Sequence, residues 1–196
     1  MDLTKIKLVI TDVDGVLTDG GLYYTAEGEV MKRFHVHDGL GMKMLQTCGI
    51  QVGVISGGDH PLLRKRLEVL KVNFAKLGKM EKRTACFELM EAAGVTPEQT
   101  AFIGDDTLDL PAFEVCGLAI ATRNAHDYVK QQADWVLEKA GGEGAFREVS
   151  DKILAAQGFE EIFSTADGFL TIAQKMAQEF YIAFPISLIS FFLKCH

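Results

Sequence analysis

Short apolar runs that end on polar or glycine-containing segments recur along the chain, and segments of helical periodicity separate them. The runs predict strands at residues 6–11, 51–55, 72–75, 100–103, 118–121 and 135–137. Apolar residues at helical spacing predict helices after Gly39 and at residues 60–70, 81–93, 110–115, 128–132 and 145–157. Alternating strands and helices are typical of a doubly wound parallel sheet, so we predict an α/β fold of the Rossmann type.

Two segments of the chain depart from this alternation. Residues 21–25 and 29–34 flank Ala26-Glu27-Gly28 and predict a β-hairpin inserted after the first strand. We expect one domain over residues 1–158, including hairpin 21–34, and a partly apolar C-terminal tail over 159–196. The stretch 180–193 is strongly apolar, but it is short and Pro185 interrupts it, so we expect disorder or subunit packing rather than a membrane span.

Composition narrows the classes of function. A chain of 196 residues suits one domain, and a net charge of −7 argues against nucleic acid as a partner. The four cysteines are scattered without a Cys-x-x-Cys pair, as is usual for reduced thiols. The N-terminus shows no basic segment followed by an apolar one, so no secretory signal is predicted. We therefore expect a cytoplasmic protein.

The first apolar run ends on two carboxylates. Asp12 and Asp14 are separated by one residue and followed by Gly15. In extended backbone, residues two apart project from the same face. Neighbouring carboxylates repel and are costly near a core unless a cation neutralises them. This stretch alone fits a divalent-metal site and an ordinary polar turn equally well.

Later predicted strands also lead into polar residues, and in a parallel sheet their carboxyl ends meet at one edge. These residues are Ser56, Lys82, Asp105, Asp106 and Asp109. Phosphoryl transfer through a covalent carboxylate needs such a set. An ionised aspartate attacks phosphorus, and a second carboxyl moves the proton. A hard cation such as Mg²⁺, a hydroxyl, backbone N–H groups and a lysine hold the phosphoryl oxygens.

The segments that carry these residues resemble four motifs of the haloacid dehalogenase phosphohydrolase superfamily. They are Asp12-Val13-Asp14-Gly15-Val16-Leu17-Thr18, Val54-Ile55-Ser56-Gly57, Lys82 and Gly104-Asp105-Asp106-x-x-Asp109. Supporting stretches at 32–41, 109–111 and 141–148 resemble more specifically the subgroup of 3-deoxy-D-manno-octulosonate 8-phosphate (KDO 8-phosphate) phosphatases. The similarity runs from about residue 7 to residue 158.

The resemblance implies a role for each residue of the set. It implies that Asp12 is the nucleophile and Asp14 the general acid/base. It also implies that the phosphoryl group is bound by Ser56, Gly57 and Lys82. Mg²⁺ is implied to bind Asp12, the main-chain carbonyl of Asp14, and Asp105, with support from Asp106 and Asp109. Lys82 is chosen over Lys79 because the family lysine lies four residues after the glycine that matches Gly78.

The resemblance further implies an enzyme of lipopolysaccharide synthesis that releases phosphate from KDO 8-phosphate through an aspartyl-phosphate. Such enzymes have no large cap domain, and they form homotetramers in which the hairpin and the C-terminal segment reach neighbouring active sites. Lys32 and Arg33 alternate along the hairpin, so one of them is a candidate to face a neighbouring site. Many relatives have Arg at the positions of His37 and Gly58, and these departures concern the substrate more than the reaction.

Three other functions remain open at this stage. The same chemistry could act on a sialic-acid-type 9-phosphate, or the fold could serve a regulatory or assembly protein without turnover. A signalling receiver module also combines clustered Asp, Ser/Thr and Lys on a parallel sheet. Receivers carry the acceptor aspartate on a middle strand of the chain, whereas Asp12 and Asp14 follow the first predicted strand. This position favours turnover.

Overall fold

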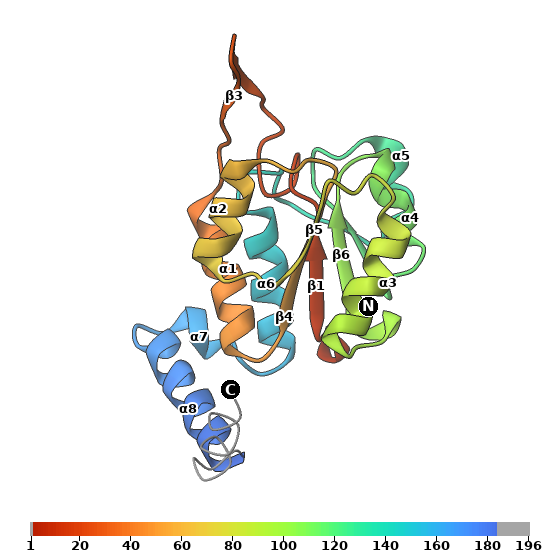
Figure 1. The fold of residues 1–196 in the computed structure, drawn as a ribbon. Coiled ribbons are helices and arrows are strands. Elements are labelled where there is room, and N and C mark those ends of the chain that lie inside the picture. Colours follow the sequence, from red (N-terminus) through yellow and green to blue (C-terminus); the bar gives the residue numbers. More distant parts are fainter. Residues whose placement is uncertain (1, 184–196) are drawn as a thin grey trace, which may run out of the picture.

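The sheet of the protein is parallel and six-stranded. The computed structural model describes residues 2–183, and its sheet has the order β5-β4-β1-β6-β7-β8 (Figure 1). The strands are β1 (Leu8–Thr11), β4 (Gln51–Ser56), β5 (Phe74–Leu77), β6 (Thr100–Gly104), β7 (Leu118–Ala121) and β8 (Trp135–Val136). From β1 the chain builds outward to β5 and then returns to β6 on the other side of β1. The strand order therefore switches between β1 and β6, where open α/β folds bind their ligands.

Helices cover both faces of the sheet, as the alternating pattern predicts. One face carries α1 (Val36–Thr47), α2 (Pro61–Leu70) and α6 (Ala145–Ala156). The other carries α3 (Lys82–Ala93), α4 (Leu110–Phe113) and α5 (Asp127–Lys130). Short 3-10 helices lie at η1 (Leu3–Lys5), η2 (Pro97–Gln99) and η3 (Thr107–Asp109). The predicted doubly wound α/β fold is confirmed.

The central strand, β1, explains why the sheet is covered by helices on both faces, which gives a fold of three layers. Val9 packs into the core on the α1 side, while Leu8 and Ile10 pack into the core on the α3 side. All three are fully buried, as expected for a parallel strand covered on both faces. The apolar run therefore leaves β1 no polar side chain before Thr11, and the first carboxylate follows where the strand ends.

The predicted hairpin is present and projects from the carboxyl edge of the sheet (Figure 1). Its arms are β2 (Tyr23–Thr25) and β3 (Gly28–Met31), paired antiparallel. Arg33 fastens its base, with Nη1 lying 3.3 Å from Asp19 Oδ2 and 2.9 Å from Glu143 Oε1.

Two regions differ from the sequence pattern. The strand expected at 72–75 lies at 74–77, because the Val72 N–H instead bonds the Leu67 carbonyl and closes the end of α2. Residues beyond 158, expected as a tail, include α7 (Glu161–Ser164) and α8 (Gly168–Ala183). Ile162 and Ile172 of these helices are buried in the core.

The apolar stretch 180–193 lies mostly outside the described residues. Within residues 2–183, none of the helices has the length and apolar character needed to cross a bilayer.

Candidate active site

The sheet brings the predicted polar residues to one edge. Asp12 directly follows β1, Ser56 ends β4, and Asp105 directly follows β6. Lys82 is the first residue of α3, which Glu81 caps by accepting the N–H groups of Arg83 and Thr84. The residues lie around the switch point because the four preceding strands are parallel and adjacent.

Lys82 lies at the centre of this group. Its side chain is 2% exposed, and Nζ lies 2.8 Å from Asp12 Oδ1 and 2.6 Å from Asp109 Oδ1. Burial opposes its charge, but the carboxylates of Asp12 and Asp109 outweigh that effect and raise the pKa of Lys82. The lysine is therefore a permanent cation between two carboxylates.

Asp109 is fully engaged by the protein. One carboxylate oxygen accepts from Lys82, and the other accepts the N–H groups of Asp105 at 2.8 Å and Asp106 at 3.2 Å. These bonds hold the β6 loop and Lys82 in fixed relation. We expect Asp109 to be a supporting residue, and its carboxylate connects the Lys82 ammonium to the backbone that follows β6.

The carboxylates of Asp12, Asp105 and Asp109 offer oxygen atoms that lie within 4.8 Å of one another. Burial, followed by the charges of Asp109 and Asp12, raises the pKa of Asp105 to about 8. Burial also raises the pKa of Asp12 to about 6, although Lys82 opposes this shift. The single ammonium of Lys82 does not balance the buried carboxylates of Asp12 and Asp109 and the partly buried carboxylate of Asp105, so the cluster lacks positive charge.

A divalent cation fits this cluster. Asp105 Oδ1 is buried and has no hydrogen-bond partner, so it is an acceptor that lacks a donor or a cation. Mg²⁺ prefers carboxylate and carbonyl oxygens, which are the donors present at this edge. Asp106, which we expect to support the metal site, lies on the exposed rim and accepts bonds from the Thr107 N–H and the Tyr128 hydroxyl.

Asp14 lies on the solvent side of the cluster. Its side chain is 42% exposed, and its Oδ1 lies 2.6 Å from the Nζ of Lys32. A cavity of about 220 Å³ opens beside it, lined by Asp14, Leu22, Tyr24, Lys32, Ser56, Gly58, Asp59, His60 and Leu63. The sequence indicates Lys32 only as a candidate for a neighbouring site, and it contains no signal for the contact that Lys32 makes with Asp14 of its own chain.

Ser56 faces the same cavity. It is 1% exposed, its Oγ accepts the Gly58 N–H at 3.2 Å, and its carbonyl accepts the Lys79 N–H at 2.9 Å. The Ser56-Gly57-Gly58 turn is thus held in a fixed shape at the end of β4. Lys79, the rejected alternative to Lys82, contributes its backbone here rather than an ammonium in the carboxylate cluster.

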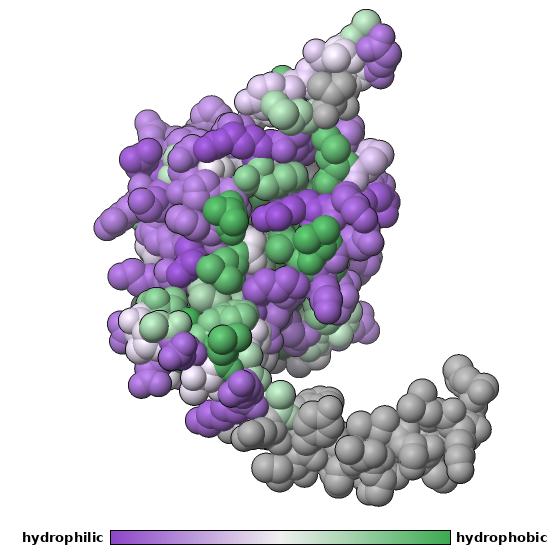
Figure 2. All heavy atoms as spheres, turned by 90° about the vertical axis from the view of Figure 1, so that its left-hand side faces the viewer, coloured by the Kyte–Doolittle hydropathy of each residue, from purple (hydrophilic) through white to green (hydrophobic). Residues whose placement is uncertain are grey.

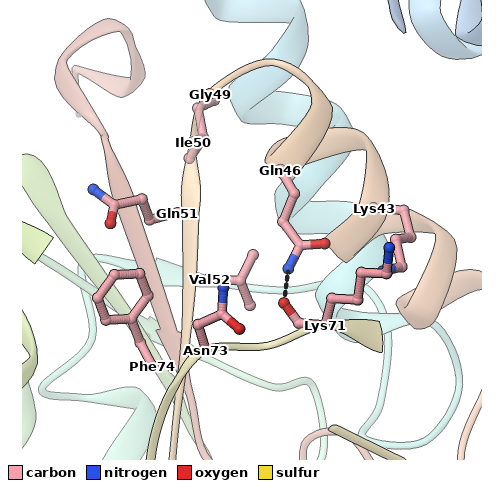
Figure 3. A pocket seen from close by; sticks show the side chains of 9 residues that line it. All are labelled: Lys43, Gln46, Gly49, Ile50, Gln51, Val52, Lys71, Asn73 and Phe74. Atoms are coloured by element: carbon pink, nitrogen blue, oxygen red, sulfur yellow. Dashed lines mark hydrogen bonds between the residues drawn. The ribbon is translucent and has the colours of Figure 1, made fainter. Parts of the chain in front are cut away.

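A second cavity, of about 340 Å³, lies at the opposite edge of the sheet (Figure 3). Two side chains of its lining donate to backbone carbonyls at the end of α2: Lys43 donates to the Leu70 carbonyl, and Gln46 donates to the backbone carbonyl of Lys71 at 3.1 Å. Cations and donors are favourable at the carbonyl end of a helix. These residues therefore have a structural explanation, and the lining contains no carboxylate or nucleophile.

Comparisons with known proteins agree with this geometry. The profile of the haloacid dehalogenase-like hydrolase family matches residues 42–148, which include Ser56, Lys82 and Asp105. The 3-deoxy-D-manno-octulosonate 8-phosphate phosphatase of Haemophilus influenzae is 58% identical over 176 residues, covering 90% of this chain and 98% of the relative. The phosphatase of the same name from Escherichia coli K12 is 41% identical over 154 residues, covering 79% of this chain and 82% of the relative.

Solved structures show the same similarity. A cobalt-bound structure of the Haemophilus influenzae phosphatase superposes with a TM-score of 0.85 at 59% identity, covering 87% of this chain and 99% of the other. The Moraxella catarrhalis phosphatase, solved with magnesium, phosphate and KDO, superposes with a TM-score of 0.79 at 36% identity. This alignment covers 83% of this chain and 93% of the other.

Proposed function

The chain belongs to the haloacid dehalogenase-like hydrolase family, and from this membership we propose that it hydrolyses KDO 8-phosphate to KDO and inorganic phosphate. The observation that carries the proposal is the extent of the likeness to the Haemophilus influenzae phosphatase of that substrate, 58% identity over 98% of its length. The enzyme is a phosphatase that uses Mg²⁺. Its product would enter lipopolysaccharide synthesis.

Asp12 is the proposed nucleophile. Its buried carboxylate is held by Lys82 at 2.8 Å and lies at the switch point of the sheet. An oxygen of Asp12 attacks phosphorus, the bond to the sugar oxygen breaks, and an aspartyl-phosphate forms. Asp14 gives its proton to the departing sugar oxygen. It then takes a proton from a water molecule, which attacks the aspartyl-phosphate and releases phosphate and free Asp12.

The remaining residues of the site are proposed to bind the phosphoryl group and Mg²⁺. Ser56 Oγ, the Gly57 N–H and the Lys82 ammonium are the proposed ligands of the phosphoryl oxygens. An ammonium has three donors, and Asp12 and Asp109 occupy two of those of Lys82. Asp12, Asp105 and the main-chain carbonyl of Asp14 would hold Mg²⁺, with Asp109 bracing the loop and Asp106 at its rim. The bound cation would offset the repulsion between carboxylates and phosphate.

Phosphate release from a panel of sugar phosphates tests the proposal. We expect Mg²⁺-dependent release from KDO 8-phosphate and none in Asp12→Asn, with folding checked by circular dichroism. Unchanged activity in Asp12→Asn contradicts the nucleophile. Turnover of a sialic-acid-type 9-phosphate without turnover of KDO 8-phosphate contradicts the substrate. A stable phosphoprotein without turnover indicates a receiver.

The proposed assembly is a cytoplasmic homotetramer in which the hairpin and C-terminal segment reach neighbouring active sites. The exposed apolar residues of the hairpin include Leu22, Tyr24 and Met31. Figure 2 shows further apolar surface among charged side chains on the face that α1 and α2 form. Val36 of α1 and Val69 of α2 are also exposed. These surfaces support subunit contacts. Light scattering tests the mass, and Tyr24→Asp is expected to weaken the assembly.

A further inference from the structure

The contact between Lys32 and Asp14 is unequal in burial. The Lys32 side chain is 6% exposed and that of Asp14 is 42% exposed, with 2.6 Å between Nζ and Oδ1. Exposed ion pairs are mobile and weak, but an ammonium removed from water needs its acceptors in fixed positions. Short, charge-assisted contacts of this kind orient the groups they join. Lys32 therefore constrains the direction of the Asp14 carboxylate.

The second oxygen of Asp14 faces a different neighbour. A Cβ placed on Gly58 would lie 3.9 Å from Asp14 Oδ2 and 3.8 Å from Ser56 Oγ. Oδ2 is therefore on the side of the turn proposed to bind the phosphoryl group, while Oδ1 is turned toward the hairpin. The two oxygens of one carboxylate are thus in distinct surroundings.

We propose that Lys32 is a positioning residue that makes Oδ2 of Asp14 the proton-carrying atom. The inference rests on the proposed function, in which Asp14 is the acid/base. A proton on Oδ1 would point at the hydrogens of the ammonium, so the proton resides on Oδ2. From Oδ2 it passes to the sugar oxygen as the phosphorus–oxygen bond breaks, and the proton taken from water returns to the same atom.

The hairpin thereby acts on the chemistry of its own subunit. Lys32 follows β3, while Leu22 and Tyr24 of the same hairpin line the cavity beside Asp14. The next residue, Arg33, instead pairs with Asp19 and Glu143. A substitution of Arg33 is therefore a control, because it removes ion pairs at the base of the hairpin and leaves the contact between Lys32 and Asp14 in place.

The test compares two esters that have no carboxylate, so that lost binding of the sugar acid does not enter. The butyl phosphate leaving group needs a proton, whereas p-nitrophenolate departs without one. The ratio of kcat/KM for the two esters reports proton donation during phosphoryl transfer. Because both are measured on one preparation, partial unfolding cancels from the ratio.

We expect Lys32→Met to lower kcat/KM for butyl phosphate by about 10²-fold, with a far smaller loss for p-nitrophenyl phosphate. Lys32→Arg should restore most of the ratio, and Arg33→Met should leave it at the wild-type value. A wild-type ratio in Lys32→Met overturns the inference when Asp14→Asn shows the selective loss. If Asp14→Asn also keeps the wild-type ratio, the proposed role of Asp14 fails instead.

Discussion

Gly15 and Asp105 lie so close together that no methyl group fits between the Gly15 Cα and the Asp105 carboxylate. A Cβ on Gly15 would lie 2.0 Å from Asp105 Oδ2, and Gly15 has a φ of +90°. The sequence indicates Gly15 as a turn residue after two aspartates. The structure adds that its bare Cα lets the β1 loop approach a carboxylate after β6, which closes the proposed metal site.

Gly15→Ala is therefore expected to abolish Mg²⁺-dependent phosphate release and to weaken Mg²⁺ binding. The methyl group displaces Asp105, and the left-handed backbone adds strain of about 1–3 kcal/mol. The matched control is Gly49→Ala, where φ is +78° but no atom lies within 4 Å of the new Cβ. Titration calorimetry with Mg²⁺ distinguishes the two variants, and equal binding in both would contradict the steric explanation.

Stability without metal is expected to fall as pH rises. The folded-state pKa values of Asp12, about 6, and Asp105, about 8, exceed the ordinary aspartate value. Between the ordinary and the raised values, the folded protein binds more protons than the unfolded chain, so the free energy of unfolding decreases with rising pH. Mg²⁺ binds the ionised carboxylates, so its stabilising effect grows over the same interval.

Thermal unfolding with EDTA and with saturating Mg²⁺, at about pH 5.5 and about pH 8, measures this linkage. The Mg²⁺-induced rise in Tm should be clearly larger at the higher pH. Asp105→Asn should remove most of that difference. An equal rise at both values would show that these carboxylates do not take up the cation.

Lys82→Met is expected to abolish activity and to lower the free energy of unfolding by about 3–5 kcal/mol, because it leaves buried carboxylates without their partner. The ammonium lies between Asp12 and Asp109, and the substitution keeps its apolar stem. The control is Lys79→Met, three residues earlier and exposed, with an expected change within about 0.5 kcal/mol. Urea denaturation measures the free energy of unfolding of both variants. Similar losses in Lys82→Met and Lys79→Met would contradict the buried role given to Lys82.

The sequence predicts the central carboxylates because parallel strand ends converge. Asp12, Ser56 and Asp105 each lie where an apolar run stops, so their proximity follows from the fold. The role of Asp109 is not predictable in this way. An aspartate in a first helical turn has a sufficient local explanation, and its bonds to Lys82 and the Asp105 N–H depend on how α3 and β6 pack.

Contacts between residues far apart in the sequence account for the other features that the sequence does not predict. Lys32 lies 18 residues after Asp14, and the path of the hairpin back to the sheet decides which residue it meets. In the helices after residue 158, Phe169, Ile172 and Met176 recur at helical spacing, but their contacts with the core depend on how α7 and α8 fold back against it. Local patterns do not contain this information.

Asp38 supplies the last prediction, because it caps a helix to which it does not belong. It lies in α1, yet its Oδ1 accepts the Arg147 N–H in the first turn of α6 at 2.9 Å. The N-cap residue of α6 is Gly144, which has no side chain to do so. Burial raises the pKa of Asp38 to about 6, while the backbone bonds oppose that shift.

Asp38→Ala should lower the free energy of unfolding by about 1–2 kcal/mol through the loss of this cap. Asp38→Asn keeps the acceptor oxygen and removes a buried charge, so it should lower the free energy of unfolding by less than Asp38→Ala does. Asp127→Ala is the matched control, since that first-turn aspartate is 93% exposed and should change stability by less than about 0.5 kcal/mol. Urea denaturation at neutral pH ranks the three variants. If Asp38→Ala costs no more than Asp127→Ala, the bond between α1 and α6 does not stabilise the fold.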